Sequence, residues 1–534
     1  MSTSQPSTAA AEVQDTNFSG TRQHYGSTQS STPTAPKPTT ASSRVIAPDL
    51  LRGLILPLMS LDHAALFMGA WLHGTPKQTE SAGTPMTQWN FNSAYISRTI
   101  THLCAPGFFF LMGMGTVYFH RSRARLGWGK ARMAKHFAVR AVALTLVSEV
   151  MGESLMWGRH ILVINIVLIG LAVDYLLCGL LCLALDSSET VTARWMERLD
   201  GRKDDASTPL LRGEDGHVAE EQRGSHGSSA RSQSMSFWLH NLLLVTLTYI
   251  TIFWNVWLSP THGHCPSTSV HPTITTTSST VPIELLALTS NTSTNPSPIP
   301  AISGRSAWID FWFLPVQNQY VMSGFPPLAW ISFCLFGMLY ARIMLHHRWS
   351  ASIVIMGNLS IAILLSVLFV ATRLFHFGNL SEACLHMPEH LSHPGKNQYL
   401  ASVKSFFYVT KYPPSPSFFA FTMAINFGLL ALFSAIPPTV AIKIPGLMNF
   451  GGSALFFYVA HMYLYSLLSI LARYFFEHDL PDKPPNEWER TKGLGASAPF
   501  WIIWVLGLFI LNPMCKAYGR FKSAQSTDSL WRFF

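Results

Sequence analysis

Histidines and carboxylates inside apolar segments are the residues of this sequence best suited to chemistry. Charged groups and imidazoles are costly in hydrocarbon, so each one is a candidate for function. Among them, His63 and His102 are the strongest candidates, because imidazole transfers protons near neutral pH. The ionisable side chains in predicted membrane spans are Arg52, Asp62, His63, His102, Arg140, Glu149, Glu153, Arg373, His376 and His461.

The depths of these side chains in their spans are similar. At 1.5 Å per residue, His63 lies roughly 20 Å along the first span and His461 roughly 15 Å along the ninth. His102 lies roughly 9 Å below the opposite face. Glu149 and Glu153 fall in the same, lumenal, half of the third span. Candidates from four helices are therefore expected at one level of the bundle.

Spacing indicates which candidates share a helix face. Arg52 and His63 are eleven residues apart, about three turns, and so lie on one face of the first span. Glu149 and Glu153 share a face at i, i+4. Asp62 points about 100° away from His63 and is a poor partner for it.

Structural alternatives remain open for three candidates. Arg52 near a helix end can extend its charge to lipid phosphates. Arg140 can form a structural ion pair with Glu149 or Glu153. His461 can serve as an interhelical hydrogen-bonding residue.

The helices that must position these groups follow from composition. Of the 534 residues, 12% are charged and 48% hydrophobic, and the mean hydropathy is +0.23. A soluble protein carries about 25% charged residues. We expect an all-α, polytopic transmembrane bundle of ten or eleven helices. The predicted spans are residues 50–72, 96–119, 137–157, 161–185, 237–258, 328–345, 352–375, 417–436, 451–473 and 500–518, with 308–314 as an interfacial eleventh element.

Basic residues set the predicted orientation. The loop after the second span carries six Lys and Arg residues, and the first loop carries only Lys77. The positive-inside rule places the second loop and, for ten spans, both termini in the cytosol. The predicted divisions are a disordered tail (1–43), four spans with the active site (44–185), a charged cytosolic loop (186–236), the fifth span (237–258), a Ser/Thr/Pro-rich lumenal loop (259–307), the remaining spans (308–518) and a cytosolic tail (519–534).

Several lumenal features follow from this topology. The sequons at Asn291 and Asn379 fall on the lumenal side, and so do Cys265 and Cys384, which are candidates for a disulfide. His386, Glu389, His390 and His393 have spacings that suit metal ligands, but Pro388 interrupts them, so we favour an interfacial loop and predict no metal. The charge of +9 lies mainly in short loops, so no nucleic-acid partner is expected.

Five ordered motifs resemble one known family. They are Asp49-Leu50-Leu51-Arg52-Gly53-Leu54 running to Asp62-His63; Thr101-His102-Leu103-Cys104-Ala105-Pro106-Gly107 running to Gly113; Gly324-Phe325-Pro326-Pro327 running to Trp330; Lys411-Tyr412-Pro413-Pro414-Ser415-Pro416; and Phe450-Gly451-Gly452-Ser453 running to Tyr458 and followed by His461. Over residues 44–525, apart from the two long loops, the sequence resembles membrane acetyltransferases that share the heparan-α-glucosaminide N-acetyltransferase catalytic domain.

The resemblance implies acyl transfer from acyl-CoA to a sugar or glycan acceptor. We expect acetyl-CoA as co-substrate, with its phosphates near Arg52 and the basic loop residues Arg121, Arg123 and Arg125. His63 is expected to act as general base or to be acetylated itself, with His102, assisted by Glu149 or Glu153, orienting the reactants. His461 is a further catalytic candidate.

The active histidine is open between two positions. The lysosomal branch of the family has Asn where His63 stands, and its catalytic histidine lies in the first lumenal loop, where His73 is the nearest counterpart. The competing functions are a proton-coupled, metal or solute transporter, and a non-catalytic membrane protein. The expected partners are the lipid bilayer, a small-molecule or glycan acceptor and a second copy of the chain, in an endomembrane or the plasma membrane.

Overall fold

A computed structural model describes most of the chain after residue 45. The described residues are 46–72, 74, 80–155, 163–165, 167–207, 218–265, 307–317, 320–441, 443–480, 492–526 and 529, without the side chains of 200–229, 307 and 317. They belong to one compact unit, Val45–Phe534. The predicted tail (1–43), most of the loop 259–307 and the sequon at Asn291 lie outside the described residues.

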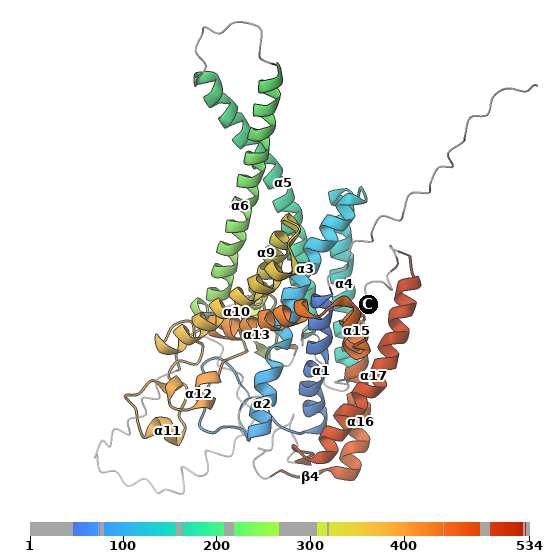
Figure 1. The fold of residues 1–534 in the computed structure, drawn as a ribbon. Coiled ribbons are helices and arrows are strands. Elements are labelled where there is room, and N and C mark those ends of the chain that lie inside the picture. Colours follow the sequence, from blue (N-terminus) through green and yellow to red (C-terminus); the bar gives the residue numbers. More distant parts are fainter. Residues whose placement is uncertain are drawn as a thin grey trace, which may run out of the picture. The chain divides into compact units, whose positions relative to one another are not determined.

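The protein is an all-α, multi-pass membrane bundle, as predicted (Figure 1). Within the described residues, eight helical segments are long and apolar enough to cross a membrane. The helices that match the ten predicted spans are α1 (Ala47–Met68), α2 (Asn92–Thr101) with α3 (Cys104–Arg125), α4 (Lys130–Leu155), α5 (Leu168–Ser207), α6 (Val218–Trp257), α9 (Ile331–His346), α10 (Ala351–Leu374), α13 (Pro416–Ala435), α16 (Ala454–Phe476) and α17 (Ala498–Ala524).

Two of these ten helices are not among the eight. α9 has only 16 residues and follows a 3-10 turn, η1 (Pro327–Ala329). α4 carries many charged side chains, which lower its hydropathy. The second predicted span is also divided, because the helix breaks between α2 and α3 at His102 and Leu103. The predicted eleventh element is the short helix α8 (Ala307–Phe313).

The predicted start of the fourth span is wrong. Val163–Asn165 forms strand β1, which pairs in parallel with β3 (Val321–Ser323), and β2 (Val316–Gln317) completes the small sheet. The Asn165 side chain fixes this arrangement by donating to Ser323 Oγ at 3.0 Å and to the Phe325 carbonyl at 2.7 Å. A second small sheet joins β4 (His478–Asp479) to β5 (Lys492–Gly493).

The charged segment after the fourth span is largely helical and is not the loop that we expected. α5 and α6 are each 40 residues long in total, and they project together beyond the ends of the other helices (Figure 1). Near the base of this pair, Arg342 of α9 donates to Glu189 of α5 at 2.6 Å and to Asn241 of α6 at 2.8 Å.

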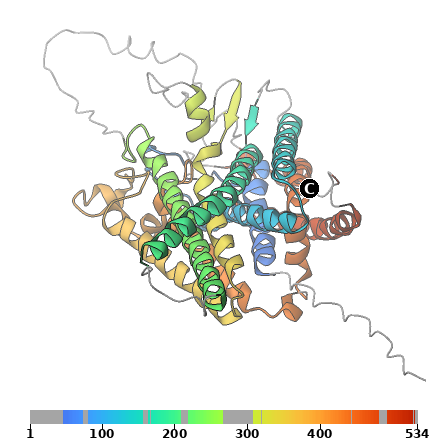
Figure 2. The ribbon, with the colours of Figure 1, turned by 90° about the horizontal axis from the view of Figure 1, so that it is seen from above.

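α1 packs against α2, α3, α13, α16, α17 and α15 (Pro445–Gly452), and in Figure 2 it lies among them (blue). Glycine allows the closest of these contacts. A Cβ on Gly53 would overlap the Leu447 carbonyl, and a Cβ on Gly451 would overlap the Asp49 carbonyl. The two backbones therefore touch, and of the two glycines that end α15 this contact requires only Gly451. The predicted start of the ninth span is too early, because Gly451 and Gly452 belong to α15 and α16 begins at Ala454. A short helix, α14 (Pro438–Ala441), precedes α15.

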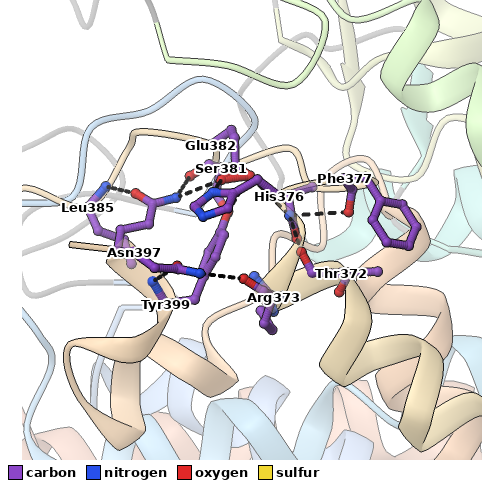
Figure 3. A network of polar contacts seen from close by, with 11 residues as sticks. Thr372, Arg373, His376, Phe377, Ser381, Glu382, Leu385, Asn397 and Tyr399 are labelled. Carbon is purple, nitrogen blue, oxygen red and sulfur yellow. Dashed lines mark hydrogen bonds and ion pairs between the residues drawn. The ribbon is translucent and has the colours of Figure 1, made fainter. Parts of the chain in front are cut away.

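A cap of short elements covers one end of the bundle, which the positive-inside rule makes lumenal. It contains α11 (Pro388–Leu391), η2 (Gln398–Leu400) and α12 (Val403–Phe407). The disulfide between Cys265 and Cys384, the two cysteines considered as a pair from the sequence, joins the cap to the segment that follows α6. Glu382 organises the cap by accepting hydrogen bonds from His376 at 2.8 Å, Tyr399 at 3.2 Å, Asn379 and Gln398 (Figure 3).

The second sequon lies inside this network. Asn379 is 4% exposed, and its side chain donates to the Thr372 carbonyl at 3.1 Å as well as to Glu382. In the folded protein, the Asn379 side chain is therefore not accessible for glycosylation. Asn397 closes the same region by donating to the Arg373 carbonyl at 2.8 Å (Figure 3).

Candidate functional site

Two histidines from opposite ends of the sequence meet inside the bundle. His63 Nδ1 of α1 lies 2.7 Å from His461 Nε2 of α16, and their rings stack with centroids 5.0 Å apart. His461 is fully buried and His63 is half-buried. The structure thus joins two of the predicted catalytic residues in one hydrogen bond.

The hydrogen bonds determine which nitrogen carries each proton. His461 Nδ1 lies 2.9 Å from the Phe457 carbonyl oxygen, which can only accept, so this nitrogen carries hydrogen. In neutral His461 the other nitrogen, Nε2, must then accept from Nδ1–H of His63. The Nε2 lone pair of His63 is left to take a proton or attack a carbon.

A cavity of about 330 Å³, named here the inner cavity, leads toward this pair from the predicted cytosolic end. Leucine, methionine and phenylalanine side chains form half of its wall, and three cations, Arg52, Arg140 and Lys522, also line it. Tyr458 lines the cavity and also packs edge-on against His63, with ring centroids 6.2 Å apart. The inner cavity is therefore a largely apolar space with three cations on its wall, and Tyr458 separates it from the histidine pair.

A second cavity, the outer cavity, opens near the other end of α1 and measures about 620 Å³. Its wall combines the aromatic rings of Trp71, Trp89 and Phe91 with polar side chains, among them Asn90 and His478. This mixture is typical of a site for a small polar ligand with an apolar face.

α1 connects the two cavities. Arg52, Leu56 and Met59 face the inner cavity, and residues 70–72 line the outer one. His63 lies one turn, roughly 6 Å, beyond Met59 and roughly 10 Å before Ala70. The histidine pair is thus placed between two spaces that approach it from opposite sides.

An ion cluster lies on the lumenal side of His63 and consists of Asp62, Glu80, Arg98, His102 and Lys411. Arg98 donates twice to Glu80, with Nη2 at 2.6 Å and Nε at 2.8 Å, and His102 Nε2 lies 3.5 Å from the same carboxylate. The side chains of all three residues are at most 1% exposed. Arg98 also donates to the Val409 carbonyl and stacks on the Tyr408 ring. A buried pair of this kind is strongly destabilised when one partner is removed.

Lys411 connects Asp62 to the rest of the ion cluster. Its Nζ lies 3.9 Å from Asp62 Oδ2, and its backbone N–H donates to Glu80 at 3.2 Å. Burial disfavours the charged ammonium, but Tyr412 and Asp62 outweigh this and hold the pKa of Lys411 above its ordinary value.

The predicted partners of His102 are wrong. Its nearest carboxylate is Glu80, whereas Glu149 accepts from the Ile164 backbone N–H at 3.3 Å and Glu153 is exposed. Arg140 was also a candidate for an ion pair with one of these carboxylates. Its guanidinium instead lies 4.8 Å from the centre of the Tyr175 ring, in a cation–π contact.

The basic residues of the second loop are not where we expected them. Arg121 donates to the Leu345 carbonyl at 2.8 Å, Arg123 stacks on Phe119 and Trp128, and Arg125 is exposed. None of the three lines the inner cavity. Arg52 does line it, and it also contacts Asp49 and the Gly451 carbonyl. His73 lies outside the described residues.

The histidine cluster of the cap is dispersed. His390 Nε2 contacts the Gln398 carbonyl and Ser405 Oγ, and His393 contacts Ser392. The Trp89 indole N–H donates to Glu389 and is the main cause that lowers the pKa of that carboxyl. Within the described part of the chain, no group of three or more His, Cys, Asp and Glu side chains is placed to hold a metal.

Sequence reasoning missed three members of the ion cluster. Arg98 carried a usable signal, because it stands in the apolar second span four residues before His102 and so shares its face. Glu80 is the one acidic residue between the first two spans. Lys411 stands in a quoted motif, but nothing local assigns it a partner.

Comparison with known proteins finds no family model that matches the chain and no curated protein with significant similarity to it.

Proposed function

We propose that this chain is an integral membrane acyltransferase that moves an acyl group from acyl-CoA to an amine or hydroxyl of a sugar-type acceptor. The observation that carries the proposal is the position of His63, between two cavities of different chemistry that approach it from opposite ends of α1. Acetyl-CoA as donor and a glycan as acceptor come from the family that the sequence motifs resemble.

The inner cavity suits the donor. CoA carries phosphates at one end and a long, flexible thioester arm at the other. Arg52 and Lys522 supply positive charge for phosphate, to which Arg and Lys are well suited. The apolar wall then accommodates the arm, and the thioester end reaches the turn of α1 that carries His63.

The outer cavity suits the acceptor. Aromatic rings such as Trp71 and Trp89 pack on the apolar face of a ligand, and Asn90 and His478 supply polar contacts to its edge. Because the two cavities open at opposite ends of α1, donor and acceptor would enter from opposite sides of an endomembrane or of the plasma membrane.

His63 supplies the proton chemistry. Its Nε2 lone pair takes the proton of the acceptor hydroxyl or amine as that group attacks the thioester carbon, and later returns it to the leaving thiolate. Nδ1–H stays bonded to His461 throughout, so the ring keeps its position in both charge states. The two-step route through an acetylated histidine would use the same Nε2.

The test is turnover by the full chain in lipid nanodiscs. Acetyl-CoA is added with glucosamine as a probe acceptor, and free CoA thiol and N-acetylglucosamine are measured together. The proposal predicts that both products form in equal amounts. If the full chain in nanodiscs did not bind acetyl-CoA, the proposal would be contradicted.

A transporter is the second candidate, because buried charges between two opposed cavities also suit a solute pathway. Uptake of labelled glucosamine into proteoliposomes without acetyl-CoA separates the two functions. The acyltransferase proposal predicts no such uptake, whereas uptake without thiol release would favour transport.

A further inference from the structure

Tyr458 lies at the inner cavity with a buried hydroxyl that has no hydrogen-bond partner among the described residues. Its side chain is 5% exposed, and its ring lines the cavity. The ring packs edge-on against both members of the histidine pair, with centroids 6.2 Å from His63 and 5.6 Å from His461. The unused donor therefore belongs to the residue that joins the cavity to the histidines.

Other deeply placed tyrosines in the described structure satisfy their hydroxyls. Tyr340 donates to Asn358 Oδ1 at 2.9 Å, Tyr465 to the Trp504 carbonyl at 2.7 Å and Tyr95 to the Lys404 carbonyl at 2.6 Å. A buried donor without a partner costs about 1–3 kcal/mol. Phenylalanine would fill the same space without this cost. The Tyr458 hydroxyl is therefore best explained as a hydrogen-bond donor to a bound ligand.

We propose that the Tyr458 hydroxyl donates a hydrogen bond to the carbonyl oxygen of the acyl thioester and stabilises the oxyanion that forms on it. This inference rests on the proposed function and adds a catalytic residue to it. Tyr458 stands one helical turn before His461, so α16 presents this donor and the partner of the base on one face.

The reaction balances with these groups. The acceptor nitrogen or oxygen bonds to the carbonyl carbon while its proton moves to His63 Nε2, and the C=O electron pair moves to the oxygen that faces Tyr458. The pair then returns, the C–S bond breaks, and the thiolate takes the proton from His63. Tyr458 keeps its own proton throughout, because it acts only as a hydrogen-bond donor.

Tyr458→Phe tests this role, since it removes one oxygen and keeps the ring. Loss of one oxyanion donor is expected to lower kcat by about 10²–10³-fold. KM for acetyl-CoA should stay within about threefold, because the contact strengthens in the transition state. Tyr340→Phe is the matched control, since it removes a half-buried, hydrogen-bonded hydroxyl on α9 that lines neither cavity. Unchanged kcat in folded Tyr458→Phe would overturn the inference.

A second readout does not need turnover. In the His63→Ala background, the carbonyl stretch of bound [1-¹³C]acetyl-CoA is measured by infrared difference spectroscopy with and without the additional change Tyr458→Phe. A hydrogen bond from Tyr458 lowers this frequency, so the double variant should absorb at higher frequency. Equal frequencies with intact binding would overturn only the role of Tyr458. Absence of acetyl-CoA binding in every variant would overturn the proposed function as well.

Discussion

His63 and His461 stand 398 residues apart in the sequence and share a hydrogen bond of 2.7 Å. The Phe457 carbonyl, one turn before His461, holds that residue in the form that accepts from His63. An imidazole whose second nitrogen is fixed in this way presents a defined lone pair. The pair therefore assigns different roles to two predicted catalytic residues, with His63 as the reacting group and His461 as the group that positions it.

The first prediction concerns this positioning. His461→Phe keeps an aromatic ring but removes the acceptor, so His63 should lose its fixed tautomer and kcat should fall by about 10²-fold. His461→Gln retains a side-chain acceptor and should recover part of the loss. The ¹⁵N shifts of labelled His63 would report the tautomer independently of turnover.

His240→Phe is the matched control for that prediction. His240 is also a buried helical histidine, bonded to the Ser236 carbonyl four residues earlier, but it lies on α6 away from both cavities. It should leave kcat unchanged. Equal kcat for the wild type and His461→Phe would contradict the positioning role.

The second prediction concerns the stability of the ion cluster. Glu80→Gln leaves Arg98 buried without its countercharge and should lower the free energy of unfolding by about 3–5 kcal/mol. Asp186→Asn breaks an exposed ion pair, in which the side chains of Lys130 and Asp186 are 51% and 45% exposed. This change should lower the free energy of unfolding by only about 0–1 kcal/mol. Denaturant titration of both variants in the same micelles checks the difference. Similar losses of free energy of unfolding in the two variants would show that the buried ion cluster stabilises the fold no more than an exposed ion pair does.

The third prediction concerns donor binding. Arg52→Gln and Lys522→Gln should raise KM for acetyl-CoA about tenfold with little change in kcat, which corresponds to a loss of about 1.4 kcal/mol of binding. S-acetylpantetheine, which lacks the phosphates, should be insensitive to both changes. Arg121→Gln serves as the control, because its guanidinium bonds to the Leu345 carbonyl away from the inner cavity. If Arg121→Gln raised KM more than Arg52→Gln and Lys522→Gln do, the phosphates would bind at the second loop and not at the inner cavity.

The fourth prediction concerns glycosylation. Asn379 is buried, and its amide is bonded within the cap, so no glycan should be attached there in the folded protein. Mass spectrometry of the peptide that contains Asn379, before and after deglycosylation, would check this. A fully occupied site would mean that the cap folds differently.

Hydropathy was sufficient to predict most helices, because each long apolar block needs a helix to satisfy its backbone in a membrane. It failed at residues 163–165, where a short apolar run cannot be told from a strand by periodicity alone. It also missed the extension of α5 and α6, because polar helices outside the membrane leave no apolar signal.

The site was predictable only in part, and for a related reason. His63, His102 and His461 stood out because imidazoles are rare in hydrocarbon. Glu80 and Lys411 did not, because they lie in connections, and their partners are brought together only when the bundle and the cap assemble. Tyr458 was quoted as part of a motif, but its unpartnered hydroxyl is visible only once the packing around it is known.

Thiol release from acetyl-CoA by the purified chain, compared between wild type, His63→Ala and His240→Ala, tests whether His63 is the reacting group. We expect release by the wild type and by His240→Ala, and loss of release in folded His63→Ala that still binds acetyl-CoA. Near-normal release by His63→Ala would show that His63 is not the reacting group between the two cavities.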